Sequence, residues 1–367
     1  MCIYLLVDLL LLYMFYIYRN KDESIIYYFS CALVFLLMAC HNGIFDLELD
    51  YTNYMNLFLG KPSMYGNIDV KDAFDLEKPF YYFDHFLRIF PREPFVYIIS
   101  VAVIFCLPLF VIIKRQSYNP ALSLLLLMVL NNTMIFTFFF SIHRQMMAVV
   151  YFLWAYIINE SNIKKRLKLV FVTIFCGIGL LSHSSSYFVL PIALVLFFIP
   201  APSKKVLYFL VIGALGVGIF SATFIKDQMT NLMLMLGDAE EIQRSTYYLA
   251  TGRYDDNALH LMTSLPPMAA LASIFIYFYS KEELQKYSVK CWILAFVLFL
   301  SLSSVPLINR AIILFFLIGL AGAIPESIKK KNVKDVFLLS MILFVYIAFR
   351  AYSRPEYLML PYNFIWS

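Results

Sequence analysis

Long apolar runs recur from one end of this sequence to the other, and they restrict the chain to very few folds. The core of a bilayer is about 30 Å thick, so roughly 20 apolar residues in a helix cross it. Because lipid offers the backbone no hydrogen-bond partners, each run must be helical. We count twelve such segments, at residues 3–18, 24–41, 95–113, 119–138, 143–159, 167–182, 187–199, 206–225, 263–279, 290–304, 308–323 and 336–351. The sequence therefore predicts an all-α polytopic membrane protein with about 12 transmembrane helices in one integral membrane domain, residues 1–367.

Composition supports this class of protein and excludes others. Hydrophobic residues make up 62% of the chain and charged residues only 14%, a balance that soluble domains do not have. The net charge of +5 is small and gives no indication of a nucleic-acid partner. The six cysteines form no C-x-x-C pair and mostly lie in apolar runs, so we interpret them as core residues. Asp8 and the lack of a basic start favour a retained first span over a cleaved signal peptide.

Basic residues alternate between the two sides of the predicted bundle. Cytoplasmic loops of membrane proteins carry an excess of Lys and Arg. Of the 29 Lys and Arg residues, 17 fall in six short alternate loops, which we therefore place in the cytoplasm. Both termini and two long loops, residues 42–94 and 226–262, then lie outside, on the periplasmic or exterior side. Loops of this length in a compact membrane protein are usually functional.

Several segments are too short to cross a bilayer. Segment 167–182 would be about 24 Å long at 1.5 Å per residue, against a hydrocarbon core of roughly 30 Å. The link that follows it, around His183, is therefore expected to lie below the outer surface. Asn309 and Arg310 occupy a similar link further along the chain. These features predict a polar cavity in the outer half of the membrane.

Arg144 is the most unexpected cation in such a chain. It stands beside His143 at the start of an apolar segment and follows another apolar run. An arginine at the centre of a bilayer costs roughly 2.5–3.5 kcal/mol on insertion scales, so it normally faces a polar cavity and has a partner. Several arginines around one cavity suit a phosphorylated ligand, because guanidinium matches phosphate oxygens bidentately. The candidate groups near outer helix ends are His143, Arg144, His183, Arg310 and Arg350, and Arg253 can join them from the second long loop.

Carboxylates of the first long loop are the candidate general bases, together with His183. They are Asp46, Glu48, Asp50 and Glu77. We rank Glu77 first, His183 second and Asp50 third. Spaced carboxylates also suit a divalent metal ion, and Asp46-x-Glu48-x-Asp50 leaves that alternative open. A solvated loop face for the carboxylates and simple snorkelling of the arginines to the headgroups also stay open.

Two local features of the first loop support these assignments. Tyr51 and Tyr54 lie one helical turn apart after Asp50 and offer aromatic faces to sugar rings. Pro79 restricts Lys78 to extended geometry, so we expect a stiff segment beside Glu77.

The chain resembles the EpsG-like, Wzy-type polymerases of bacterial surface polysaccharides. The resemblance covers about residues 45–365, and its pieces are individually short. They are Asp50-Tyr51-x-x-Tyr54, Glu77-x-Pro79-Phe80, Arg144-Gln145-x-x-Ala148, His183-Ser184-Ser185, Asn309-Arg310 and Pro361-Tyr362.

The resemblance implies a bundle like those of the type C glycosyltransferases, in the bacterial inner membrane, with its active site facing outward. The implied substrates are undecaprenyl pyrophosphate-linked oligosaccharides of O-antigen, capsule or exopolysaccharide. Arg144 and Arg310 would then neutralise the leaving pyrophosphate, with Arg253, His143, Tyr51 and Tyr54 as further binding residues. Glu77, His183 or Asp50 would accept the proton. We expect no metal and no cofactor, and a chain-length regulator protein is a further expected partner beside the bilayer itself.

Other functions fit the same sequence. A glycan ligase would share the fold and the arginines and differ only in its acceptor. A lipid-linked glycan flippase or transporter would place its site near the midplane on broken helices from paired repeats. Here the ionisable residues crowd the outer ends, and we find no internal repeat. A membrane acyltransferase also uses a His, but the cytoplasmic loops are too short and basic to serve its donor.

Overall fold

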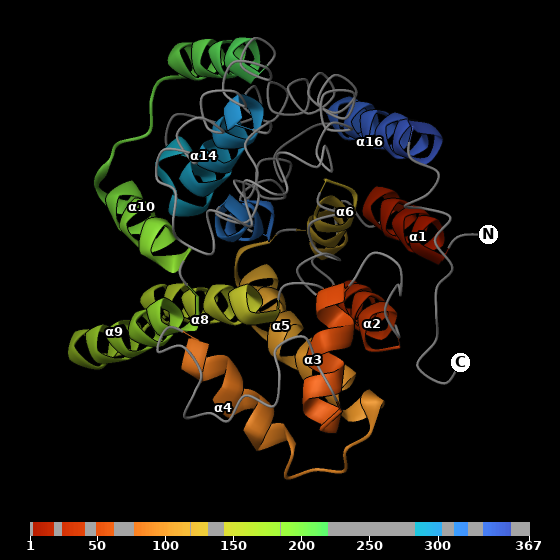
Figure 1. The fold of residues 1–367 in the computed structure, drawn as a ribbon. Coiled ribbons are helices and arrows are strands. Elements are labelled where there is room, and N and C mark those ends of the chain that lie inside the picture. Colours follow the sequence, from red (N-terminus) through yellow and green to blue (C-terminus); the bar gives the residue numbers. More distant parts are fainter. Residues whose placement is uncertain are drawn as a thin grey trace. The chain divides into compact units, whose positions relative to one another are not determined.

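The computed structural model describes ten stretches of this chain. They are residues 3–17, 24–40, 49–61, 77–117, 119–130, 143–183, 185–218, 283–302, 312–321 and 333–353. Every regular element within these stretches is a helix (Figure 1). The chain divides into two compact units, the first made of Met1–Ile192 with Leu320–Ser367 and the second of Ala193–Gly319.

The helices fall where the apolar runs predict them. The matching elements are α1 (Ile3–Ile17), α2 (Ser24–Ala39), α5 (Pro94–Gln116), α6 (Pro120–Leu130), α8 (His143–Asn159), α9 (Lys165–Ser182), α10 (Ser186–Phe198), a helix over 204–218, α14 (Tyr287–Leu302), Ile312–Ala321 and α16 (Val333–Ser353). The predicted segment 263–279 lies outside the described residues, as does the end of segment 119–138. The all-helical prediction is confirmed for the described part of the chain.

Among the described helices, α5 is the one long and apolar enough to cross a membrane by itself. It begins at Pro94, where a missing N–H costs nothing, and its last turn carries Lys114 and Arg115. The described part also holds shorter apolar helices, including most of α1, α2 and α10. These apolar helices agree with the expected membrane protein, while the described residues do not establish a count of twelve spans.

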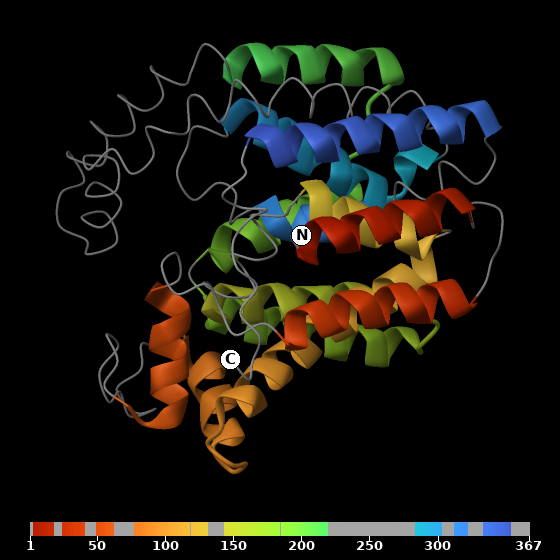
Figure 2. The same cartoon turned by 90° about the vertical axis from the view of Figure 1, so that its right-hand side faces the viewer.

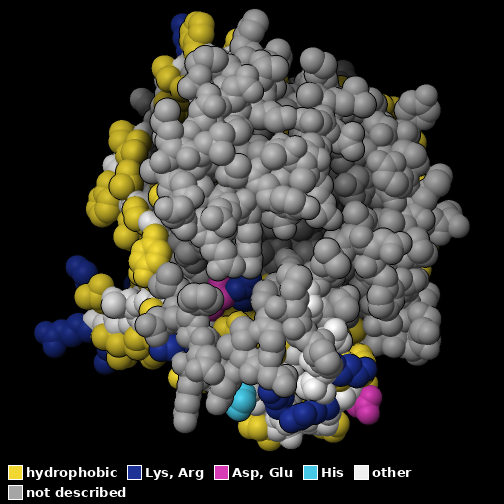
Figure 3. All heavy atoms as spheres, in the orientation of Figure 1, with side chains coloured by type: hydrophobic (Ala, Val, Ile, Leu, Met, Phe, Trp, Pro, Cys, Tyr) yellow, Lys and Arg dark blue, Asp and Glu magenta, His cyan; other side chains and the backbone are white. Residues whose placement is uncertain are grey.

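Large apolar side chains are exposed on several of these helices. On α9 they include Leu169, Val170 and Phe171. Figure 3 shows hydrophobic side chains where α9 lies in Figure 1, with basic side chains gathered at its end. That end is its first turn, since Lys165, Arg166 and Lys168 all lie there. An apolar face this large is typical of a helix that faces lipid, because exposing so many apolar side chains to water is unfavourable.

Hydrogen bonds fix the relative directions of the helices in the first unit. At their first residues, α5 and α8 meet through Tyr97 and His143. At their last residues they meet again, where Gln116 Nε2 donates to the Tyr156 hydroxyl at 2.6 Å. The two helices are therefore parallel. The chain returns through α9, whose Lys168 Nζ donates to the Asn159 carbonyl at 2.7 Å, so α9 runs antiparallel to α8.

These directions sort the charged groups into two ends of the unit. The starts of α5 and α8 and the end of α9 share one end, which holds His143, Arg144 and His183. The opposite end holds the basic residues in the last turn of α5 and in the first turn of α9. The Arg144 group and the basic residues of the predicted cytoplasmic loops therefore lie at opposite ends of the same helices.

The first long loop, for which the sequence predicts no regular element, contains two short helices. They are α3 (Leu49–Leu59) and α4 (Lys78–Leu87). In Figure 2, α3 lies across the ends of α2 and α8 rather than parallel to them. Tyr54 and Phe58 of α3 and Phe80 of α4 are buried. The loop is therefore packed onto the bundle at the end where Arg144 lies.

Gly60 ends α3 in a left-handed conformation, with a φ of 70°. The Gly60 N–H donates to the Leu57 carbonyl, and the Lys61 N–H donates to the Asn56 carbonyl. These two bonds make a Schellman motif, which favours glycine because a Cβ is strained at positive φ. The motif therefore ends α3 at this glycine.

The expectation of an extended Lys78 is wrong, because Lys78 is the first residue of α4. Proline is tolerated in the first turn of a helix, where the N–H that it lacks would have no partner. Pro79 therefore stiffens the start of α4 by fixing its own φ, and Glu77 becomes the residue that precedes the helix.

In the second unit, α14 packs closely on the helix Ile312–Ala321. A Cβ on Gly319 would lie 2.7 Å from Trp292 Cα, so only glycine allows this approach. Lys290 Nζ donates to the Leu196 and Ile199 carbonyls near the end of α10. This lysine satisfies carbonyl groups that the end of a helix leaves without partners.

Candidate active site

Arg144 lies in the first turn of α8 and contacts the two helices of the first long loop. Its Nη1 forms an ion pair with Glu77 Oε2, and its Nε donates to the Tyr54 hydroxyl at 3.2 Å. The Arg144 side chain is 21% exposed and that of Glu77 is 16% exposed. The sequence separations of 67 and 90 residues show that the fold, rather than local sequence, brings these groups together.

Glu77 is placed for this contact by its position at the start of α4. It is the N-cap residue, with φ of −121° and ψ of 2°, but its side chain makes no capping hydrogen bond. Acidic side chains at this position usually bond the first backbone N–H groups of their own helix. Here the carboxylate is turned to Arg144 instead, so helix capping does not account for it.

A cation at the start of α8 does not stabilise that helix. The N-terminal end of a helix carries partial positive charge and favours anions. The first turn of α8 has no acidic residue, and Arg144 adds positive charge there. The N-terminus of α8 and the guanidinium of Arg144 therefore act together as an attraction for an anionic group.

His143 lies behind Arg144 and is only 1% exposed. Its ring stacks on Tyr54 with centroids 4.7 Å apart and an interplanar angle of 22°. Its Nδ1 and the Tyr97 hydroxyl lie 2.7 Å apart and share a hydrogen bond. His143 thus joins α3, α5 and α8, and in this position it holds Tyr54 against Arg144 rather than facing a ligand.

Gln145 connects the start of α8 to the link between α9 and α10. Its Nε2 donates to Ser185 Oγ at 3.1 Å. Ser185 Oγ lies 2.9 Å from His183 Nδ1, and the Ser185 backbone N–H also donates to that nitrogen at 3.1 Å. Two hydrogen bonds therefore connect His183 to Gln145, the residue next to Arg144, and His183 and Arg144 belong to the same end of the unit.

The buried face of α4 adds a second ion pair near the first. Arg88 Nη2 lies 2.6 Å from Asp84 Oδ2 and also donates to the Leu57 carbonyl of α3 at 2.9 Å. Burial raises the pKa of the Asp84 carboxyl above its ordinary value, and Arg88 opposes this shift. Burial likewise raises the pKa of Tyr81, with the positive charge of Arg144 opposing it. The Asp84–Arg88 pair fastens α4 to α3 and so supports the positions of Glu77 and Tyr54.

The other residues proposed from the sequence are only partly described. Asp50 and Tyr51 lie in α3, but their side chains are not described. Arg253, Arg310, Asp46 and Glu48 lie outside the described residues, and of Arg350 only the backbone, in α16, is described. Among described side chains, no group of three or more His, Cys, Asp or Glu residues is arranged to hold a metal ion.

The sequence reading did not assign four residues that complete this cluster. They are Tyr81, Tyr97, Gln145 and Ser185. Gln145 and Ser185 lie beside Arg144 and His183 in the short motifs. Their polar side chains next to candidate residues are the sequence feature that could have indicated them. Tyr97 carries no such signal, because a tyrosine near the start of an apolar segment is common at a membrane interface.

Comparison with known proteins assigns the chain to a family. Neither the curated proteins nor the solved structures contain a match to it. The model of the EpsG family matches residues 25–364, which is nearly the whole sequence. The match runs through all the residues that meet at Arg144, and we conclude that this chain belongs to the EpsG family.

Proposed function

We propose that this protein polymerises undecaprenyl pyrophosphate-linked oligosaccharide repeat units on the outer face of the bacterial inner membrane. Membership of the EpsG family supports a polysaccharide polymerase-type role. The apolar helices support a location in a membrane.

The observation that carries the proposal is the placement of Arg144. It lies at the positive end of α8, is held by Glu77 and Tyr54, and stays partly exposed. This arrangement suits a ligand with phosphate charge. The basic loops expected in the cytoplasm lie at the other end of the same helices, so the anion site belongs to the predicted outer side.

In the proposed reaction, a hydroxyl oxygen of the acceptor repeat unit attacks the anomeric carbon of the donor glycan. The bond from that carbon to the pyrophosphate oxygen breaks, and the electron pair leaves with the carrier pyrophosphate. The acceptor hydroxyl loses its proton to a base. Arg144 stabilises the charge that develops on the leaving group, which is a large contribution in a site of low polarity. Arg310 and Arg253 are proposed to contact the same pyrophosphate.

Glu77 is proposed as the base, and its ion pair with Arg144 suggests that donor binding controls when it can accept a proton. In the absence of substrate, its carboxylate is the partner of Arg144. A pyrophosphate group carries more negative charge and competes for the same guanidinium. Donor binding would then weaken the ion pair and release the carboxylate to accept the proton. His183 is the second candidate and Asp50 the third. Tyr51 is proposed to contact sugar, whereas Tyr54 is buried against His143 and supports Arg144 instead.

The remaining parts of the proposal concern the whole protein. About twelve transmembrane helices in a type C glycosyltransferase-like bundle would surround the site, with loops 42–94 and 226–262 outside. A chain-length regulator is a proposed partner. A glycan ligase with the same fold is the second candidate, and a flippase is the third.

The test is a reaction of the purified protein with lipid-linked repeat units of the producing organism in detergent. Polymerisation yields a ladder of products on the carrier and releases undecaprenyl pyrophosphate. A ligase forms a product only when a different acceptor, such as lipid A core, is added. A flippase leaves the glycan and the carrier unchanged. An absence of chain growth with an otherwise folded protein would reject the proposal.

A chelation arm addresses the carboxylates of residues 46–50. Polymerisation that persists after exhaustive chelation and dialysis is the expected result. Loss of activity that Mg²⁺ or Mn²⁺ restores would instead support the alternative in which Asp46, Glu48 and Asp50 hold a metal ion.

A further inference from the structure

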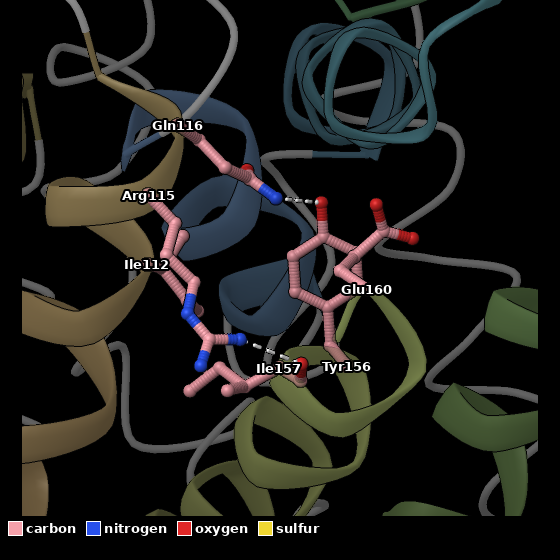
Figure 4. A pocket seen from close by; sticks show the side chains of 6 residues that line it. All are labelled: Ile112, Arg115, Gln116, Tyr156, Ile157 and Glu160. Atoms are coloured by element: carbon pink, nitrogen blue, oxygen red, sulfur yellow. Dashed lines mark hydrogen bonds between the residues drawn. The ribbon is translucent and has the colours of Figure 1, made fainter. Parts of the chain in front are cut away.

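A small pocket lies between the last turns of α5 and α8, at the opposite end of these helices from Arg144. Its volume is about 130 Å³, and Figure 4 shows the side chains around it. They are Ile112, Arg115, Gln116, Tyr156, Ile157 and Glu160. The proposed polymerisation uses none of them.

Gln116 lines one side of the pocket and is held there by a hydrogen bond within the protein. Gln116 Nε2 donates to the Tyr156 hydroxyl at 2.6 Å, which fixes the orientation of the carboxamide. Gln116 Oε1 is then buried and makes no hydrogen bond to any described group. An oxygen without accessible surface cannot accept a hydrogen bond from a ligand, so binding must use the charged groups at the rim.

Two opposite charges stand at the rim. Arg115 lies in the last turn of α5, and Glu160 is the residue that follows α8. Both side chains are exposed. Arg115 Nη1 donates to the Ile157 carbonyl at 3.0 Å, which orients the guanidinium and leaves its other donors to an anion. No ion pair joins Arg115 to Glu160, although both belong to the described residues. The pocket therefore presents separate positive and negative groups to one ligand.

We propose that this pocket binds the headgroup of a phospholipid that carries both a phosphate and a primary ammonium, as phosphatidylethanolamine does. The phosphate binds Arg115 through the geometry that guanidinium and phosphate share. The ammonium has three N–H donors, and it donates to the Glu160 carboxylate. Both charges at the rim of the pocket then have a partner on one headgroup.

The surroundings favour a lipid over a soluble molecule with the same charges. The pocket lies at the end of the one described helix that is long enough to cross a membrane. Val103 and Leu107 of that helix are exposed. Leu107 and Arg115 lie on the same ridge of α5, since they are eight residues apart. Acyl chains along this ridge would lead directly to a headgroup at Arg115, and the pocket itself is large enough for a headgroup only.

The test is native mass spectrometry of the purified full-length protein with equimolar dioleoyl phosphatidylethanolamine, phosphatidylcholine and phosphatidylglycerol. We expect one phosphatidylethanolamine to be retained in preference to the other two. The choline headgroup has no N–H to donate, and the glycerol headgroup has no positive charge. Equal retention of the three lipids would overturn the proposal.

Three variants and one soluble probe refine the test. Glu160→Gln and Arg115→Gln each remove a charge-assisted hydrogen bond, so each should weaken phosphatidylethanolamine binding by roughly tenfold or more. Lys165→Gln is the matched control, since it removes an exposed charge at the same end outside the pocket, and it should keep the preference. Unchanged binding in Glu160→Gln would overturn the proposal. Tight binding of free phosphoethanolamine without lipid would assign the pocket to a soluble zwitterion and reject the lipid.

Discussion

At the scale of single residues, the site depends on the shape of arginine as much as on its charge. Arg144 uses Nη1 for Glu77 and Nε for Tyr54, which lie on different helices. A lysine carries one compact ammonium and cannot reproduce this fork. The residue is therefore held at fixed geometry by two contacts while its remaining donors can face a ligand.

Replacing Arg144 by lysine should lower polymerisation even though the charge is kept. The loss of one charge-assisted hydrogen bond is worth about 1.5–3 kcal/mol, which corresponds to roughly a 10- to 150-fold loss in kcat/KM. Initial rates with purified lipid-linked repeat units measure this. Parent-like kinetics in Arg144→Lys would show that only the charge matters.

Replacing Glu77 by glutamine tests its role as base. Loss of a general base typically lowers the rate by about 10²–10⁴-fold. The rate of Glu77→Gln should fall in this range, while carrier-lipid binding survives. Asp84→Asn is the matched control, because it changes the other carboxylate of α4 that pairs with an arginine. A turnover of Glu77→Gln within a few-fold of the parent would make Glu77 structural, and the same measurement on His183→Ala would then identify the next candidate.

The candidate residues could be predicted at this scale, but their pairing could not. Arg144, Glu77, Tyr54 and His183 are conspicuous as polar residues beside apolar segments or in a loop rich in aromatic residues. That Glu77 pairs with Arg144 depends on where α4 packs, which no local pattern specifies. His143 was interpreted as a possible second cation, and its burial between Tyr54 and Tyr97 became visible only when α3 and α5 were placed around it.

At the scale of elements, α3 and α4 determine the site. The sequence reading found the apolar helices because their runs are long and continuous. It left α3 and α4 as loop because they are short and mixed in composition. Their burial depends on α5 and α8, so the signal is tertiary rather than local.

Gly60→Ala tests the importance of the α3 end. A Cβ at a φ of 70° costs roughly 1–2 kcal/mol in the left-handed region, and here it would also lie 2.9 Å from Arg92 Nη1. The variant should melt at a lower temperature in detergent and make less polymer. Gly177→Ala is the control, because Gly177 lies within α9 with nothing within 4 Å of a new Cβ. Equal melting temperatures for the two variants would show that the end of α3 is not under conformational constraint.

At the scale of the whole molecule, sidedness connects the site with the membrane. The contacts among α5, α8 and α9 place the Arg144 cluster and the basic loops at opposite ends of the same helices. The alternation of basic residues predicted this separation. Which end faces the cytoplasm rests on the positive-inside rule, and the residues beyond the described ranges, including Arg253 and Arg310, keep their roles as predictions.

Fusions to alkaline phosphatase measure the orientation. The enzyme is active only outside the cytoplasm, so a fusion after Gly237, in the second long loop, should be active. A fusion after Lys165, at the start of α9, should be inactive. The reverse pattern would place the Arg144 cluster at the cytoplasmic face and contradict the proposed reaction.

If Arg144 serves chain growth on a lipid carrier, its loss must change the length distribution of the surface glycan in cells. Cells with Arg144→Ala as their only copy should carry single repeat units on the surface lipid and no ladder, with a normal amount of the protein in the membrane. Arg166→Ala, which removes an exposed arginine at the opposite end, should retain the full ladder. A normal ladder in Arg144→Ala cells would contradict the claim.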